Sequence, residues 1–452
     1  MVSSGGAIGV GMFLGSGGAI SLAGPAVIGA YLLGAVLMML VMAALAEMSI
    51  AMPVPGSLRA YASMCLGEWA GFVTGWMYWL SWVVLMAAEV CAVTTYLGHW
   101  MPTRSALSIG FVCALFMTWV NLMGVESFGE FDFWFCVIKV LAILGFIWVG
   151  ASVVFGFGRF VPIGLANYVS HGGLLPNGTR GMLLSLSLVM VAFSGTEVLG
   201  VAAAETHEPH KSVPLALWAI LFRTLVLFVM AIAVLVAVVP WNQVGVFGSP
   251  FVFMFESAGL RSPAHAMNVV VVIAAMSSMN LGLYTSSRML HSLSREGMCS
   301  ARLGVLDANS VPKNAVLVSA AGLFAGVCLH HLSPSGALGA VMQVAAFGFM
   351  FTWLIIALSH IRFRQLFSRT LQFRFPGYPY ASYMSAFCIL AVLWSLWLIP
   401  GQRAGVAIGL SFVALTSLVF LLLYKQRAHT KPHAAETLRL ASFFGFSRKP
   451  RR

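Results

Sequence analysis

Long apolar stretches separated by short polar segments dominate this sequence of 452 residues. Of its residues, 60% are hydrophobic and only 8% are charged, whereas soluble domains average roughly 45 to 50% and 25%. Because lipid accepts apolar surface that water does not, we predict an all-α membrane protein whose stretches each cross the bilayer as a helix of about 20 residues. The twelve predicted spans cover about 1–20, 26–46, 71–98, 106–123, 133–156, 181–203, 214–239, 265–290, 314–330, 337–360, 382–399 and 404–424.

The positive residues behind the net charge of +12 gather in the loops expected on one side of the membrane. Of the 25 Lys and Arg residues, 18 fall in alternate loops and the tail 425–452, five fall in the opposite loops, and Lys139 and Arg223 lie inside predicted spans. The positive-inside rule places the basic side in the cytoplasm, so with an even number of spans both termini are expected there. We therefore predict a multi-pass protein of the bacterial inner membrane, in contact with lipid and with no nucleic acid partner.

Several other classes of protein lack support. The seven cysteines show no paired spacing, and the loop 205–211 mixes His and Glu without the spacing of a zinc site. The sequence contains no P-loop and no hydrolase motif, so neither ATP-driven transport nor an enzyme is indicated. No metal and no cofactor is expected. Because the first span begins at Met1 without a basic flank, we expect the natural start to lie upstream.

Two predicted spans are interrupted by glycine and small polar residues. The first contains Gly9, Val10 and Gly11, and the sixth contains the run 191–197 with Gly195. Discontinuous helices at matching positions of two five-helix halves indicate an inverted-repeat transporter with a site near the midplane. A positive half-helix end suits a carboxylate and freed carbonyls suit an ammonium, so together they suit an amino acid. The alternative is that these glycines only allow close helix packing.

These breaks define a domain organisation. We predict one transmembrane domain, 1–424, followed by the basic cytoplasmic tail 425–452. Within the domain, repeat one covers about 1–156, repeat two about 181–360, and the peripheral spans about 382–424. The sequence does not indicate an oligomeric state.

A series of short fragments, taken in order along the chain, is typical of one family of membrane proteins. The fragments are Gly5–Gly9, Phe13–Gly17, Ala23–Pro25, Ala46–Met48, Pro55–Ser57, Gly75–Trp79, Phe128–Trp134, Ile138–Val140, Gly195–Glu197, Glu205 with Pro209, Lys211 and Pro214, and Leu283–Leu290. Through them the sequence resembles the amino acid transporter branch of the amino acid–polyamine–organocation superfamily. The resemblance implies a LeuT-type fold, with 5+5 inverted repeats and broken helices 1 and 6, and proton-coupled uptake of amino acids. It implies that the substrate carboxylate meets the backbone of Gly9, Val10 and Gly11, and that the amino group meets carbonyls before the second break.

Three ionisable residues lie within predicted spans, where a charge is costly and indicates function. Glu89 either binds the substrate ammonium or carries a proton; the alternative is a neutral acid bonded to a backbone carbonyl. Lys139 matches a lysine of proton-coupled relatives and can take the place of a coupling cation, or it merely ties helices together. Glu197 either caps the half-helix after the second break or acts in gating or proton coupling.

The remaining site candidates come from the second break and from the eighth span. Val191, Ser194 and Gly195 flank the break and are expected to contact the substrate. Phe193 either covers the substrate as an aromatic lid or packs between helices. Asn280 is a candidate for the wall of the site.

The predicted function is secondary active transport, a proton-coupled symport that imports an amino acid across the plasma membrane. Few charges face the predicted site, which favours neutral zwitterionic substrates, and the proton gradient supplies the driving force. The alternatives are an amino acid exchanger and a receptor that binds without transport. The short tail argues against the receptor, because it leaves little room for an output domain.

Overall fold

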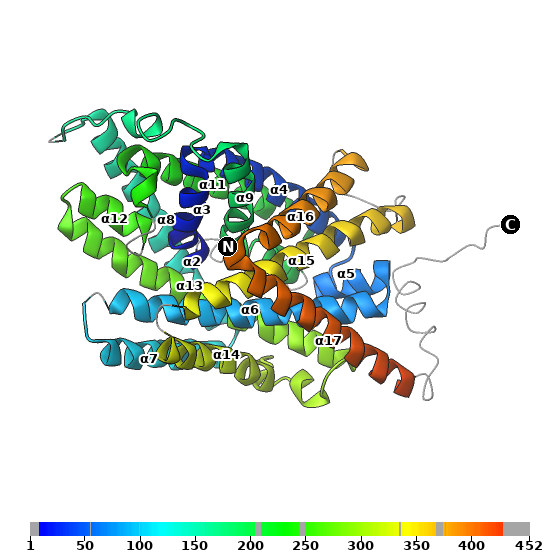
Figure 1. The fold of residues 1–452 in the computed structure, drawn as a ribbon. Coiled ribbons are helices and arrows are strands. Elements are labelled where there is room, and N and C mark those ends of the chain that lie inside the picture. The colour runs from blue at the N-terminus through cyan, green and yellow to red at the C-terminus, as the bar shows by residue number, and fades with distance from the viewer. Residues whose placement is uncertain are drawn as a thin grey trace.

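The computed structural model describes residues 9–54, 56–98, 100–158, 160–203, 209–244, 249–333, 336–367, 374–375 and 377–427. Throughout these residues the secondary structure is helical, with no β-strand (Figure 1). The predicted all-α class is therefore confirmed. Gly5–Ile8, part of the loop 205–211 and the tail from residue 428 lie outside the described residues.

The helices follow the apolar stretches of the sequence, with two short additions between them. These additions are α5 after the second stretch and α12 before the eighth, together with the short helical turns η1 to η5. The helices are α2 (Val10–Phe13), α3 (Gly15–Ala23), α4 (Val27–Ala51), α5 (Ser57–Leu66), α6 (Glu68–Leu97), α7 (Thr103–Met123), α8 (Val125–Phe155), α9 (Gly178–Ala192), α10 (Val198–Ala203), α11 (Pro209–Val238), α12 (Pro250–Ser257), α13 (Arg261–Arg295), α14 (Lys313–Leu332), α15 (Ala337–Phe367), α16 (Tyr380–Leu398) and α17 (Arg403–Arg427).

Ten runs among the described residues are long and apolar enough to cross a membrane. The difference from the predicted twelve has two sources. The first two predicted spans fall in one continuous apolar run, Gly11–Ala51, and the sixth is represented by α9, which has only 15 residues. The chain is thus a multi-pass membrane protein, and the count of twelve spans stays a prediction.

Helices α6 and α13 form the centre of the bundle. They pack along each other, and α6 also contacts α14 and α15 while α13 also contacts α8 (Figure 1). Their buried faces carry large side chains such as Trp82 and Met86 on α6 and Leu283 on α13. Since both central helices are buried along most of their length, side chains on them are held rigidly at mid-bundle depth.

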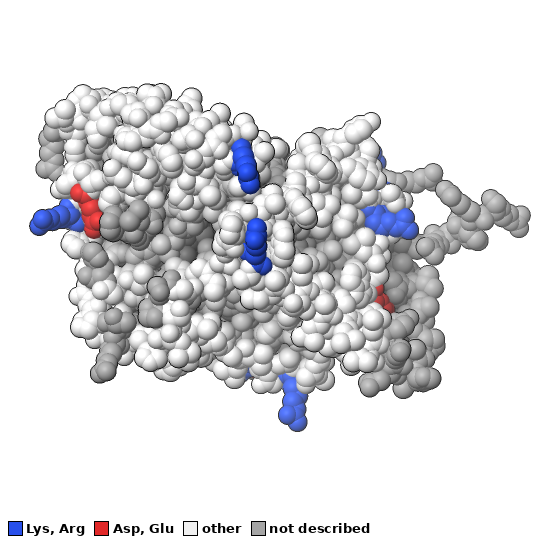
Figure 2. Space-filling view, viewed as in Figure 1, with Lys and Arg blue, Asp and Glu red and all other residues white. Residues whose placement is uncertain are grey.

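The outward surface is mostly apolar and nearly free of charge. Large apolar side chains of outer helices are exposed, among them Trp148 on α8, Phe222 on α11 and Leu418 on α17. Figure 2 shows that few Lys, Arg, Asp and Glu side chains of the described residues are visible on one face. Such a surface is unfavourable in water and is what a bilayer requires.

Glycine ends one long helix and allows the next to begin in a new direction. Gly124 separates α7 from α8 with a φ of +138°, a backbone conformation that disfavours residues with a side chain. Its carbonyl accepts the backbone N–H of Phe128 and so starts α8. This turn sets the rotation of α8, whose inner face carries the ionisable residues described below.

Candidate functional site: the meeting point of two helix breaks

The first helix break brings Gly9 against two polar side chains of the central helices. The Gly9 carbonyl accepts the N–H groups of Met12 and Phe13, which starts the four-residue helix α2. A Cβ atom on Gly9 would lie 3.0 Å from the Glu89 Oε1 atom and would overlap the Ser278 hydroxyl. The absence of a side chain at Gly9 is therefore what lets the backbone approach Glu89.

The same short helix touches the end of α9. A Cβ atom on Gly11 would lie only 2.9 Å from the carbonyl oxygen of Val191 and 3.1 Å from the Cα atom of Ala192. The structure thus brings together the two breaks that the sequence analysis singled out, which lie about 180 residues apart. Val10 lies between the two glycines, and its side chain is outside the described part of the structure.

The second break is a turn of five residues between α9 and α10. Gly195 has a φ of +94° there, and Ser194 donates from both its backbone N–H and its hydroxyl to the Val191 carbonyl, at 3.1 and 2.6 Å. The Thr196 hydroxyl donates to the Phe193 carbonyl at 2.9 Å. Side-chain hydroxyls therefore satisfy part of the backbone that the interrupted helix frees.

The carboxylate of Glu197 binds this turn and two neighbouring helices. It accepts the Gly195 N–H at 3.0 Å, the Tyr78 hydroxyl of α6 at 3.3 Å and the Trp353 indole N–H of α15 at 3.3 Å. The side chain is fully buried. The contacts are those of a cap that also ties the break to two neighbouring helices, and a role in coupling stays a prediction.

Phe193 and Asn280 both contact neighbouring helices. Phe193 stacks on Phe228 of α11 and meets Tyr31 of α4 edge-on, with ring centroids 5.6 and 6.0 Å apart. The Asn280 amide accepts from Asn121 of α7 at 2.8 Å and donates to the Phe128 carbonyl of α8 at 3.3 Å. Both residues contact neighbouring helices in this conformation, and the lid and wall roles stay predictions.

Ser278, which the sequence analysis did not single out, faces Gly9. It is two positions from Asn280 on α13, so the two side chains lie about 200° apart around the helix axis. Serine is common in this sequence, and no local signal distinguished this one from its neighbours.

Lys139 lies in the bundle interior with a partner that sequence reasoning missed. Its ammonium donates to the Ser277 hydroxyl at 2.9 Å, and this hydroxyl donates to the Asp132 carboxylate at 3.3 Å. Lys139, Ser277 and Asp132 are all 0 to 1% exposed. The signal was available, because opposite charges seven residues apart lie on one helix face.

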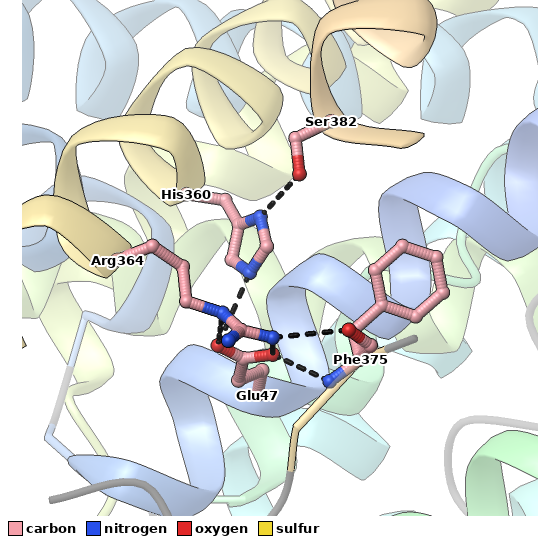
Figure 3. Close-up of polar contacts among 5 residues, drawn as sticks. All are labelled: Glu47, His360, Arg364, Phe375 and Ser382. Carbon is pink, nitrogen blue, oxygen red and sulfur yellow. Dashed lines mark hydrogen bonds and ion pairs between the residues drawn. The ribbon is translucent and has the colours of Figure 1, made fainter. Parts of the chain in front are cut away.

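A second buried charge cluster lies at the end of the bundle where α4 and α15 finish. Glu47 accepts from Arg364 and from the backbone N–H of Phe375, and it pairs with His360 at 3.3 Å (Figure 3). His360 in turn contacts the Ser382 hydroxyl of α16 at 2.9 Å. This cluster joins α4, α15, α16 and the segment before α16. The sequence analysis quoted Glu47 only as part of a family fragment.

Arg59 on α5 makes a third polar contact, with the end of α13. It donates to the Ser292 hydroxyl at 3.0 Å and pairs with Glu296 at 3.4 Å. Burial lowers the pKa of this guanidinium below its usual value, and Glu296 partly offsets that effect. The contact anchors the short helix α5 to a central helix.

No cluster of three or more His, Cys, Asp or Glu residues with the geometry of a metal site occurs in the described ranges. The polar groups around Gly9 are a carboxylate, a hydroxyl and backbone groups. This set offers acceptors for an ammonium and donors for a carboxylate, the two groups that every α-amino acid carries.

Comparison with known proteins agrees with this chemistry. The sequence model of the amino acid permease family matches residues 1–437. The chain belongs to the amino acid permease family. It is 38% identical over 445 residues to the uncharacterized amino acid permease YtnA of Bacillus subtilis, covering 96% of this chain and 94% of that protein.

Other members of the amino acid permease family have names that state a substrate. The γ-aminobutyric acid permease of Bacillus subtilis is 32% identical over 439 residues, 96% of this chain and 94% of that protein. The aromatic amino acid transport protein AroP of Escherichia coli is 34% identical over 409 residues, 90% of each. The resemblance stated from sequence fragments is therefore confirmed at the level of the family.

Proposed function

We propose that this permease imports neutral amino acids across the bacterial inner membrane together with protons. The observation that carries the proposal is the meeting of Gly9 and Gly11 with Glu89 and with the end of α9. The names of relatives, which include γ-aminobutyric acid and aromatic amino acids, support a substrate without net charge.

Binding of the substrate follows from the groups at this point. The backbone N–H groups of Val10 and Gly11 lie in the first turn of α2, and we assign them as the donors for the substrate carboxylate. Glu89 is the acceptor for the ammonium. The carbonyl of Val191 is a second acceptor for the ammonium. The ammonium either binds this oxygen together with Ser194 or replaces Ser194 as its donor. The site supplies one carboxylate, that of Glu89, for the one ammonium of the substrate. This match favours a zwitterion over an amino acid with a net positive or negative charge.

Coupling to protons rests on Lys139. An ammonium at this depth is costly unless it is paired or able to lose its charge, and a permanent positive charge in the interior disfavours binding of sodium there. Ser277, which contacts Lys139, is the direct neighbour of Ser278 at Gly9. Protonation of Lys139 and occupation of the site therefore act on the same turn of α13.

Transport requires alternating access, which we assign to two inverted five-helix repeats in a twelve-span LeuT-type arrangement with both termini in the cytoplasm. The bundle of the first, second, sixth and seventh spans rocks against the rest. The two breaks lie in the first and sixth spans, so substrate bound at Gly9 and Gly11 contacts mainly the moving part.

The test is uptake by purified permease in proteoliposomes. Twenty labelled amino acids and γ-aminobutyrate are compared under an imposed inward proton gradient, with and without an uncoupler. We expect uncoupler-sensitive accumulation of a few neutral substrates. Counterflow against preloaded substrate without gradient-driven accumulation would identify an exchanger, and binding without flux would identify a receptor.

A further inference from the structure

A directed chain of hydrogen bonds links the two buried charges of α8. Lys139 and Asp132 lie on one face, two helical turns and about 10 Å apart along the axis. Ser277 of α13 bridges them: it accepts from the Lys139 ammonium at 2.9 Å and donates to the Asp132 Oδ1 atom at 3.3 Å. The Lys139 ammonium and the Ser277 hydroxyl therefore both donate in the direction from Lys139 to Asp132.

Other ionisable groups are near this chain. Cys136 on α8, Glu89 on α6 and Arg223 on α11 are close enough to interact electrostatically with Lys139. Arg223 also interacts with Asp132, and it donates to the Cys136 sulfur at 3.6 Å. Glu89 lies at Gly9, beside the substrate site, whereas Asp132 is the carboxylate of this group that Ser277 joins to Lys139.

Asp132 lies toward the basic end of the bundle. The beginning of α8 lies next to the loop between α13 and α14. The contact that shows this is the hydrogen bond from Asn309 of that loop to the Met123 carbonyl, at 3.4 Å. This loop region contains Arg295, Arg302 and Lys313. In the orientation proposed above, the carboxylate is therefore nearer the cytoplasm than the ammonium is.

We propose that Asp132 accepts the proton that Lys139 releases during import and delivers it to the cytoplasm. The Lys139 ammonium gives a proton to the Ser277 oxygen while the original Ser277 hydroxyl proton passes to Asp132. A neutral amine and a neutral carboxylic acid result, and Asp132 then releases its proton to water on the cytoplasmic side. This inference rests on the proposed proton coupling and adds the residues of the exit path.

The alternative role for Asp132 is that of a fixed counter-charge. A counter-charge needs only to be close to Lys139, whereas a relay needs the hydroxyl between them. Ser277→Ala removes the hydroxyl and leaves both charges in place, so it separates the two roles. Asp132→Asn removes the acceptor, and Asp132→Glu restores it with a longer side chain.

The experiment uses the full chain in proteoliposomes with labelled threonine, phenylalanine and γ-aminobutyrate as probes. Each variant is assayed for accumulation under a proton gradient, for counterflow, which needs no net proton movement, and for substrate-induced proton entry with a trapped pH dye. We expect Ser277→Ala and Asp132→Asn to lose accumulation and proton entry while keeping counterflow, and Asp132→Glu to recover part of both. The matched control is Ser185→Ala, a fully buried serine of α9 whose hydroxyl donates only to its own helix, at Met182.

Two results would overturn the inference. One is gradient-driven accumulation at the wild-type level in Asp132→Asn; the other is full accumulation in Ser277→Ala, which would leave Asp132 as a counter-charge only. If Asp132→Asn loses counterflow as well, because the protein fails to fold, Ser277→Ala alone decides. A wild-type protein without gradient-driven accumulation contradicts the proposed function itself, which is a separate outcome.

Discussion

At the residue scale, the geometry of this permease depends on two glycines, which have no side chain. Gly9 and Gly11 allow a short helix to approach Glu89 on one side and the Val191 carbonyl on the other. A side chain at Gly11 would press on backbone atoms of Val191 and Ala192, which cannot move as a flexible side chain can, whereas one at Gly9 would press on the side chains of Ser278 and Glu89. Two predictions follow from these contacts.

Gly11→Ala is expected to reduce substrate affinity about tenfold, because its Cβ would lie 2.9 Å from the Val191 carbonyl oxygen and force the two breaks apart. The measurement is the apparent Kd of the purified protein for labelled substrate. Gly145→Ala on α8 is the matched control, since a Cβ there meets nothing within 4 Å. Equal affinity of the two variants would show that the breaks are not the site.

Glu89→Gln keeps the shape of the side chain and removes its charge. We expect affinity for neutral amino acids to fall by about tenfold or more, because a hydrogen bond to a charged group is worth about 1.5 to 3 kcal/mol. Binding of a substrate analogue without an amino group, such as propionate in place of alanine, should not weaken, because the variant removes a negative charge near this anion. Equal losses for both ligands would mean that Glu89 supports the fold and does not bind the ammonium.

At the scale of elements, buried polar clusters hold each helix at a defined rotation. Glu197 ties the second break to α6 and α15, and Glu47 ties the end of α4 to α15 and α16. In both, one carboxylate takes several donors from different helices. Such clusters specify which helices are neighbours, which apolar side chains alone do weakly in lipid.

Glu47→Gln is expected to destabilise the protein by about 3 to 5 kcal/mol, because it leaves the Arg364 guanidinium buried without its counter-charge. Arg364→Gln should cost a similar amount. The combination Glu47→Leu with Arg364→Met should cost less than either single change, since it leaves neither the carboxylate nor the guanidinium without its partner. Thermal stability of the purified protein in detergent measures all three, with Ser385→Ala as a buried control whose hydroxyl bonds only within α16, at Ser382. A double variant less stable than both singles would contradict this account.

At the scale of the whole molecule, the distribution of basic residues predicts the orientation of the protein in the membrane. Its apolar surface is suited to lipid. Outer helices such as α11 and α17 expose large apolar side chains, and the basic residues gather at one end of the predicted spans. The positive-inside rule then predicts which loops face the cytoplasm.

The orientation is testable with single cysteines in a background whose seven native cysteines are replaced by alanine. Ser170→Cys, in the exposed loop between α8 and α9, should react with a membrane-impermeant maleimide in intact cells. Ala308→Cys, in the exposed loop between α13 and α14, should react only after the cells are permeabilised. The reverse pattern would invert the proposed topology and with it the direction of the proton path.

The sequence by itself determined the class of this protein, the position of its apolar helices, the break after α9 and the family. These are local properties, because hydropathy, glycine content and short fragments are read along the chain without knowledge of neighbours. The tertiary structure decided which side chains meet. It placed Ser278 beside Gly9, Phe193 against α4 and α11, and Ser277 between Lys139 and Asp132. Those contacts depend on the rotation of each helix and on which helix packs beside it, and both are set by packing among residues hundreds of positions apart.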